Sequence, residues 1–287
     1  MRILVTGARG QLGMDLVEEL AGRGHDVIGA DLQEMDITDA QSVERFFGAT
    51  KPEAVIHCAA YTATDRAEAE PELCRQVNAE GTRHIAQACR AHGAKLLYIS
   101  TDYVFDGTGD TPFSVDAPTG PLSVYGQTKY DGERAVRELV ERHFVVRISW
   151  VFGLHGKNFV RTMLRLGKEN DRVFAVNDQV GSPTYTRDLS RLLADMIVTE
   201  RYGTYHATNE GYCSWYEFVL EIFACAGYTT EVVPVDSDYF KTAVRRPLNS
   251  RMDKSALDDN GFDRLPTWQD AVARYLRELE TEEAKER

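Results

Sequence analysis

The sequence predicts an α/β fold of the Rossmann type, in which a doubly wound parallel sheet is followed by a smaller C-terminal lobe. Two observations lead to this prediction. Short apolar runs alternate with helix-like segments through the first half of the 287 residues, and the first run, residues 2–6, leads directly into a glycine loop at residues 7–13. Such alternation is typical of a parallel sheet with helices on both faces. We expect a first domain over residues 1–150, and over 151–287 a lobe interleaved with the end of that domain.

Five apolar runs are the expected strands of the sheet. They are residues 2–6, 26–30, 54–58, 95–100 and 144–149. A strand buried on both faces requires this near-continuous apolar character. Helical periodicity is found between them at residues 14–23, 67–92 and 122–142. After residue 150 the alternation loosens, and we expect short strands near residues 173 and 205 and helices at 158–167, 186–198, 214–226 and 268–280.

The glycine loop has the spacing Gly-x-x-Gly-x-x-Gly, with Gln11 and Leu12 before its last glycine. A strand, a glycine turn and a helix in that order are the context of a dinucleotide-binding fingerprint. Gly7 allows the tight turn, Gly10 lets the backbone approach a pyrophosphate, and Gly13 lets the helix pack closely on the strand. The helix N-terminus then faces the phosphate charge. A glycine-rich connection without a ligand is the alternative, and the strand-loop-helix context disfavours it.

The choice between the two nicotinamide cofactors stays open at the sequence level. Asp31 ends the second strand, where a carboxylate accepts from the ribose 2′-hydroxyl and repels a 2′-phosphate, which favours NADH. Arg9 lies in the loop beside that ribose and can pair with a phosphate, which favours NADPH. Asp36 and Ile37 are placed to meet the adenine edge, although Asp36 or Asp39 can also cap the helix that follows.

Three side chains are suited to ketone chemistry. Tyr125 and Lys129 are four residues apart, which places both on one face of a helix. The ammonium can lower the pKa of the phenol and hold a cofactor sugar hydroxyl, while Thr101, after the fourth strand, can hydrogen-bond a carbonyl oxygen. Such a trio passes a proton to an oxygen while hydride moves at its carbon. Tyr-x-x-x-Lys alone is common on surface helices. Together with the glycine loop it favours a short-chain dehydrogenase/reductase.

Composition narrows the partners and the compartment. The net charge is -12 at pH 7, which argues against nucleic acid or an anionic membrane as a partner. Five widely spaced cysteines without a Cys-x-x-Cys motif are typical of free thiols in a reducing cytosol. We find no signal peptide and no apolar run of membrane-spanning length. The prediction is a soluble, cytoplasmic protein.

Motifs along nearly the whole chain resemble the dTDP-4-dehydrorhamnose reductase family. They are residues 7–13, 57–62 with Asp65 and Glu68, 100–107, 125–129, 147–153 and 178–184, followed by Arg246-Pro247 and the helix at Trp268. The resemblance implies an extended short-chain reductase. Such an enzyme reduces the 4-keto group of dTDP-4-dehydro-L-rhamnose with NADH or NADPH and gives dTDP-L-rhamnose for surface polysaccharides.

The same resemblance implies roles for individual residues. Those expected to hold the cofactor, besides the glycines, are Gln11, Leu12, Asp31, Asp36, Ile37, Ala60, Tyr61 and Thr62. Tyr125 is the expected proton donor and Lys129 the cation that binds the ribose. The residues expected to touch the nucleotide sugar are Thr101, Asp102, Trp150 and Arg246. Trp150 alone is equally compatible with a core-closing role.

Some members of this family are magnesium-dependent dimers in which carboxylates of both subunits surround the metal. Asp15, with Glu18 and Glu19, is the nearest counterpart here. Acidic residues on a helix are ordinary surface chemistry, so we commit to no metal site, and the resemblance keeps a homodimer open.

Two rival functions are weighed against the reductase. The first is a reductase or epimerase acting on another nucleotide-linked 4-keto sugar, because pocket shape decides among such substrates. The second is a non-catalytic regulatory subunit resembling that of methionine adenosyltransferase. A regulatory chain has no need for Thr101, Tyr125 and Lys129 together, so the enzyme is preferred.

Overall fold

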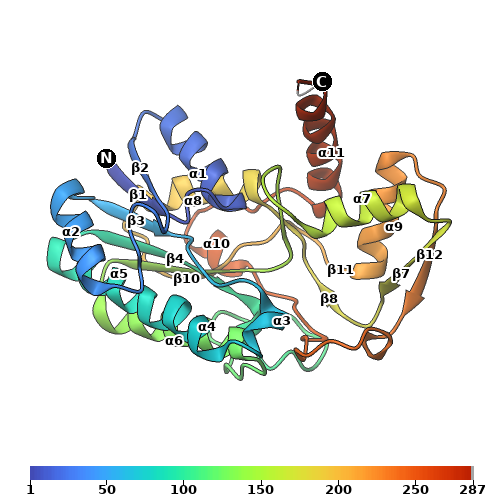
Figure 1. The fold of residues 1–287 in the computed structure, drawn as a ribbon, viewed down its shortest axis with the longest axis horizontal. Coiled ribbons are helices and arrows are strands. Elements are labelled where there is room, and N and C mark those ends of the chain that lie inside the picture. Colours follow the sequence, from blue (N-terminus) through green and yellow to red (C-terminus); the bar gives the residue numbers. More distant parts are fainter. Residues whose placement is uncertain (286–287) are drawn as a thin grey trace.

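The main body of the molecule is a six-stranded parallel sheet, seen in a computed structural model that describes residues 1–285 (Figure 1). The strand order is β10-β5-β4-β3-β1-β2. The strands are β1 (Arg2–Thr6), β2 (Asp26–Ala30), β3 (Ala54–His57), β4 (Lys95–Thr101), β5 (His143–Ile148) and β10 (Gly203–His206). The chain reverses its direction of travel across the sheet between β1 and β3. In open α/β sheets, ligands bind beyond the carboxyl ends of the strands at such a point.

Helices cover both faces of this sheet, as predicted (Figure 1). On one face α1 (Gln11–Gly22) packs against α8 (Thr186–Ile197), with the short α10 (Ser255–Asp259) nearby. On the other face lie α2 (Ala40–Thr50), α5 (Thr82–His92) and α6 (Val124–Leu139). Each face has its own apolar core, so the sheet is buried between two helical layers.

The C-terminal lobe has a separate core beside the sheet. Its helices are α7 (Phe159–Glu169), α9 (Trp215–Ala226) and α11 (Trp268–Lys285). Three strand pairs complete it: β7 (Arg172–Val176) with β12 (Glu231–Val235), β8 (Val180–Gly181) with β11 (Cys213–Ser214), and β6 (Val151–Phe152) with β9 (Thr184–Tyr185). Between these pairs the chain returns to the main body. There α8 joins the helical layer that contains α1, and β10 pairs with β5 in the parallel sheet.

One predicted helix begins later than expected. The stretch 67–92 contains the end of α3 (Thr64–Ala67), a break, and then a continuous helix formed by α4 (Pro71–Arg75), a π-helical turn (Gln76–Gly81) and α5. Proline at the first helical position has no N–H to lose, and its ring excludes a preceding turn of the same helix. Residues 122–142 are shorter as well, because the Ser123 side chain caps α6, which begins at Val124.

Candidate active site

A cleft of about 800 Å³ lies where the carboxyl ends of β1, β3, β4 and β5 meet the C-terminal lobe. The sequence-predicted site residues come together here from elements far apart in the chain. Those that line it are Gly7, Gly10, Gln11, Leu12, Gly13, Asp31, Asp36, Ile37, Ala60, Thr62, Thr101, Asp102, Tyr125, Lys129, Trp150 and Arg246. Glycine-loop residues and the predicted trio thus share one cavity.

Tyr61 is the exception among the predicted residues. Its phenol donates a hydrogen bond to Glu70 (2.6 Å), and its side chain does not line the cleft. The backbone is fixed in this orientation because the side chain of Asn78 accepts from the Tyr61 N–H (2.8 Å) and donates to its carbonyl (3.1 Å). Tyr61 is thus absent from the cleft lining while its neighbours Ala60 and Thr62 belong to it, and its expected contact with the cofactor stays a prediction.

The glycine loop is built for close backbone approach. Gly7 has a φ of +65°, and a Cβ atom there would lie 2.8 Å from the backbone nitrogen of Ala59. At Gly13 a Cβ would lie 2.1 Å from the carbonyl oxygen of Gly7. Both positions exclude a larger residue, so the loop lies tightly between β1 and the chain that follows β3. Helix α1 begins directly after it, with its N-terminus at the cleft.

At the adenosine end of the cleft, a cation and two carboxylates form a network. Asp31 accepts a hydrogen bond from the backbone N–H of Arg9 (2.8 Å). The Arg9 guanidinium pairs with Glu34, which also accepts from the backbone N–H of Asp31 (3.0 Å). Hydrogen bonding to Glu34 raises the pKa of Arg9. The only cation of this network is thus already paired with a carboxylate.

The two capping alternatives at the adenine edge are resolved by the structure. Asp39 caps α2 by accepting from the N–H of Gln41 (2.9 Å). Asp36 instead accepts from the N–H and hydroxyl of Thr38 (2.9 and 2.7 Å), which closes a local turn at the cleft.

Tyr125 and Lys129 occupy successive turns at the start of α6, which the Ser123 cap fixes. The Lys129 ammonium donates to the carbonyl of Ile99 (2.7 Å) and lies 4.2 Å from the centre of the Tyr98 ring. The side chain is 3% exposed, and burial lowers the pKa of Lys129 to about 7. The ammonium is therefore held against the end of β4 at the bottom of the cleft.

The pKa of Tyr125 differs from the sequence expectation. Burial raises it well above its usual range, a hydrogen bond with Thr101 opposes the rise, and Asp102 and Tyr103 add to it. Lys129 was expected to lower this pKa, but its ammonium points to Ile99 and burial dominates at the phenol. Tyr125 is therefore protonated at neutral pH, which is the state that a proton donor requires.

Asp102 and Thr101 form a buried pair beside Tyr125. The Thr101 hydroxyl donates to Oδ1 of Asp102 (3.0 Å) and accepts from the N–H of Tyr103 (3.3 Å). Ser250 donates to the other oxygen, Oδ2 (2.5 Å). Burial raises the pKa of Asp102 to about 6, against the opposing effect of these hydroxyl donors. Burial therefore favours the protonated carboxyl, and the hydroxyl donors favour the ionised carboxylate.

Trp150 lies in an aromatic stack that sequence reasoning missed. Its backbone φ is +49°, which is rare for a residue other than glycine. Its ring stacks on that of Trp215, with the two ring centroids 3.7 Å apart. Trp215 and Phe159 also line the cleft and pack at 4.4 Å from each other. Trp215 follows Ser214, which starts α9 with a capping box that the sequence shows as Ser-x-x-Glu. That signal locates the helix start, but only the fold brings its first residue to Trp150.

Arg246 lies across the cleft from the glycine loop and pairs with Asp65 (2.8 Å). Two arginines of α7 are engaged elsewhere, because Arg165 pairs with Glu169 and Arg161 donates to the carbonyl of Leu154. Neither of them lines the cleft, whereas Arg246 does.

The counterpart of the family's metal site does not form a metal centre within one chain. Asp15 is buried and both of its oxygens lack a hydrogen bond, with His155 at 3.7 Å. The cation nearby is Arg187, which pairs with Glu18 (3.2 Å) and Glu278 (3.3 Å). In residues 1–285 no group of three or more His, Cys, Asp or Glu side chains is arranged to hold a metal.

Over residues 1–285, none of the helices combines the length and the apolar character needed to cross a bilayer.

Comparison with known proteins places the chain in a family. The family model for the RmlD substrate binding domain matches residues 1–281. The dTDP-4-dehydrorhamnose reductase of Streptomyces griseus is 44% identical over 278 residues, covering 94% of this chain and 91% of that protein. A dTDP-4-keto-6-deoxy-D-glucose reductase of Streptomyces niveus is 36% identical and covers 99% of both.

A solved structure agrees over the same length. The dTDP-4-dehydrorhamnose reductase from Bacillus anthracis, crystallised in complex with NADP, has a TM-score of 0.94 and 43% identity, covering 96% of this chain and 99% of its own. Fold, motifs and sequence identity agree over nearly the full length. The chain belongs to the dTDP-4-dehydrorhamnose reductase family.

Proposed function

We propose that this protein reduces the 4-keto group of dTDP-4-dehydro-L-rhamnose to give dTDP-L-rhamnose, with NADPH or NADH as the reductant. One observation carries the proposal: Thr101, Tyr125 and Lys129 line the same cleft as the glycine loop. The family assignment supports the substrate class, and the NADP complex of the Bacillus anthracis relative supports the cofactor.

Each group in the cleft has a place in this reaction. The glycine loop and the N-terminus of α1 hold the cofactor pyrophosphate, and Lys129 holds the nicotinamide ribose. When bound, the cofactor supplies the hydride that reduces the ketone carbon. Tyr125 gives its proton to the ketone oxygen as negative charge develops there, and the Thr101 hydroxyl, which is held by Asp102 and hydrogen-bonds the phenol, orients Tyr125 for the transfer. Trp150 and Trp215 provide an apolar wall for the deoxy sugar.

The proposal includes Arg246 as the cation for the substrate pyrophosphate. Its guanidinium is already at the cleft and needs only to exchange Asp65 for phosphate oxygens. A homodimer remains an expectation from the family resemblance, and analytical ultracentrifugation measures it.

A second candidate function has a specific observation in its favour. The relative from Streptomyces niveus carries the name of a dTDP-4-keto-6-deoxy-D-glucose reductase and covers the whole chain. The same catalytic residues serve either ketone, so the substrate is decided by the shape of the pocket. The regulatory-subunit reading has less support, because the complete trio lines the cofactor cleft.

Coupled turnover tests the proposal. dTDP-4-dehydro-L-rhamnose is generated in situ from dTDP-glucose with the upstream dehydratase and epimerase, and NADPH or NADH absorbance is followed after adding this protein. We expect consumption that depends on the epimerase, with dTDP-L-rhamnose as the product. Consumption without the epimerase would favour the second candidate. Cofactor binding without consumption would favour the regulatory reading.

A further inference from the structure

Residues 246–254, which we call the bridging segment, connect the main body to the C-terminal lobe. The N–H of Asn249 donates to the carbonyl of Gly107 in the loop after β4 (2.9 Å). The next N–H, that of Ser250, donates to Val180 in β8 (2.8 Å). Backbone hydrogen bonds on both sides therefore fix the position of Ser250 between the two parts of the molecule.

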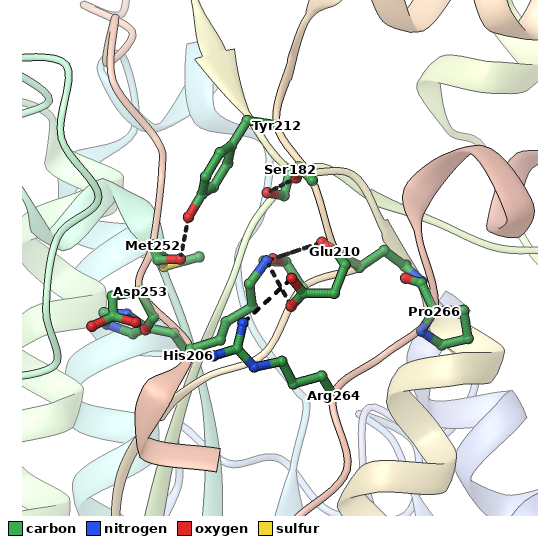
Figure 2. Close-up of polar contacts among 12 residues, drawn as sticks. Ser182, His206, Glu210, Tyr212, Met252, Asp253, Arg264 and Pro266 are labelled. Carbon is green, nitrogen blue, oxygen red and sulfur yellow. Dashed lines mark hydrogen bonds and ion pairs between the residues drawn. The ribbon is translucent and has the colours of Figure 1, made fainter. Parts of the chain in front are cut away.

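Three side chains anchor the end of the bridging segment. Figure 2 shows the Tyr212 hydroxyl directed at the backbone of Met252, to whose carbonyl it donates (3.0 Å). Nδ1 of His206 lies 2.9 Å from the carbonyl oxygen of Asp253. The third anchor is Lys254, so each of three successive residues has its own tertiary contact.

The Lys254 contact is a buried ion pair. Its side chain is 2% exposed, and its ammonium lies 3.2 Å from Glu210, which also pairs with Arg264 (3.4 Å). The ammonium also donates to the Thr208 hydroxyl and the Asn209 carbonyl, both at 3.2 Å. A buried charge with several partners fixes the backbone of its own residue. If the ammonium were separated from Glu210 and stayed buried, the free-energy cost of removing its charge from water would no longer be offset by the ion pair.

This anchoring brings one hydroxyl to the cleft. The Ser250 hydroxyl donates to Oδ2 of Asp102 at 2.5 Å, and the two side chains are 2% and 3% exposed. A Cβ atom on Gly181 would lie 2.9 Å from Cβ of Ser250 and 3.1 Å from the Trp150 ring. Ser250 and Trp150 thus pack against the same residue, Gly181. Ser250 itself belongs neither to the glycine loop nor to the trio of Thr101, Tyr125 and Lys129.

We propose that Ser250 is a positioning residue for the reduction: by donating to Asp102 it fixes that carboxylate and, through it, the Thr101 hydroxyl beside Tyr125. The inference rests on the proposed function for its catalytic meaning. Both carboxylate oxygens accept a hydroxyl, one from Thr101 and one from Ser250. Without Ser250, one buried oxygen loses its donor, and the carboxyl gains a proton to satisfy it. A protonated Asp102 donates to Thr101 and reverses the hydrogen bond that orients it.

Of the other titratable groups near Asp102, the two tyrosines ionise at much higher pH, and Lys129 ionises close to Asp102 but affects the opposite limb of the profile. The phenols of Tyr103 and Tyr125 face it, and burial raises the pKa of Tyr103 to about 12 and that of Tyr125 further. Arg246 and Asp65 act on the far side of Tyr103. On α6, Lys129 is the neighbour whose pKa lies near neutrality, at about 7. Its loss of charge at higher pH sets the alkaline limb of the pH dependence of kcat/KM. The acidic limb of that pH dependence therefore reports the protonation of the Asp102 carboxylate.

The pH dependence of kcat/KM for the keto sugar tests the proposal. In Ser250→Ala we expect the acidic limb to move up by about one pH unit, as for the loss of a hydrogen bond to a charged group, so that kcat/KM falls about tenfold on the acidic limb and about twofold at pH 7. The cofactor Kd should stay unchanged, and Ser250→Thr should restore the wild-type limb.

A matched control is Ser182→Ala. Ser182 is equally buried, and its hydroxyl donates to the carbonyl of Gly211 (2.7 Å) outside the cleft. We expect this variant to keep the wild-type pH profile. An unmoved acidic limb in Ser250→Ala, or an equal movement in Ser182→Ala, would overturn the role of Ser250.

A measurement without substrate separates this inference from the proposed function. The pKa of the Asp102 carboxyl is read by ¹³C NMR on aspartate-labelled protein, with Asp102→Asn to assign the resonance. It should rise in Ser250→Ala. An inactive wild type together with a shifted carboxyl overturns the proposed function alone, whereas an active wild type with an unshifted carboxyl overturns the inference alone.

Discussion

Burial widens the pH range over which the phenol of the proposed catalytic trio is protonated. A tyrosine is already neutral at pH 7, and burial beside Thr101 and Asp102 keeps Tyr125 neutral to higher pH. In Tyr125→Phe the proton donor is lost while the contacts of Lys129 remain. We expect kcat to fall by about 10²-fold to 10⁴-fold, the usual contribution of a positioned acid, with little change in cofactor Kd. Steady-state turnover and fluorescence titration measure the two, and near-normal turnover would rule out the donor role.

The charge of Lys129 makes cofactor binding pH-dependent. Burial depresses its pKa to about 7, so the ammonium is present below that pH and is lost as the pH rises through it. The ammonium attracts the anionic dinucleotide, so the Kd for NADH should increase above pH 7. NADH is the right probe because its diphosphate does not titrate there. Lys129→Met should bind weakly with a flat profile between pH 6 and 8, and a sloping one would assign the effect to another group.

Glu34 is a candidate determinant of cofactor preference. It pairs with Arg9, the cation expected to lie beside the adenosine ribose. Glu34→Gln should free the guanidinium for a 2′-phosphate and raise the ratio of kcat/KM for NADPH over NADH about tenfold, equivalent to about 1.4 kcal/mol. Glu19→Gln removes the same charge from α1 outside the cleft and should leave the ratio unchanged. If neither variant changed the ratio of kcat/KM for NADPH over NADH, Asp31 rather than Glu34 would be the determinant of cofactor preference.

At the scale of one element, the first turn of α6 carries both Tyr125 and its cap. The Ser123 hydroxyl accepts from the Gly126 N–H (3.1 Å), and Ser123 is 7% exposed. Ser123→Ala should lower the free energy of unfolding by about 1 kcal/mol, as for other N-caps, and lower kcat because the phenol loses its fixed position. Urea unfolding and turnover are measured together. Ser255→Ala removes one local hydroxyl hydrogen bond, to Asp253 (3.0 Å), remote from the cleft and should leave kcat unchanged.

At the scale of the molecule, a buried ion pair links α6 to the sheet. Glu133 is fully buried and accepts from Arg147 of β5 at 2.9 Å, from Arg137, and from Ser100 of β4. These partners hold the pKa of Glu133 below its usual value despite burial. Its stabilising contribution is therefore present above the unfolded-state pKa and is lost as pH falls through the lower folded-state value.

Arg147→Met tests how much the buried Glu133 carboxylate destabilises the fold when Arg147 no longer pairs with it. It leaves the Glu133 carboxylate buried with fewer donors, and we expect the free energy of unfolding at pH 7 to fall by about 3–5 kcal/mol. Chemical denaturation measures the change. The double variant Glu133→Gln with Arg147→Met should recover part of the loss, and a double variant no more stable than the single one would show that the charge is not the cause.

Local sequence patterns were sufficient for five of the six strands of the sheet and for the glycine loop that begins after the first of them. The apolar runs, the glycine loop and the Tyr-x-x-x-Lys spacing depend on periodicity and on contacts within a few residues, and these are readable without a fold. The start of α4 was misread because a periodic pattern continued across Pro71, whose backbone restriction ended it.

Only the tertiary structure decided the substrate half. Trp215 meets Trp150, and Ser250 reaches Asp102 across 148 residues of chain, through strand pairings and buried anchors that no local pattern encodes. The pKa values were decided in the same way, because desolvation depends on everything packed around a group. Sequence placed the ammonium of Lys129 near Tyr125, but the fold turned it to Ile99 and buried the phenol.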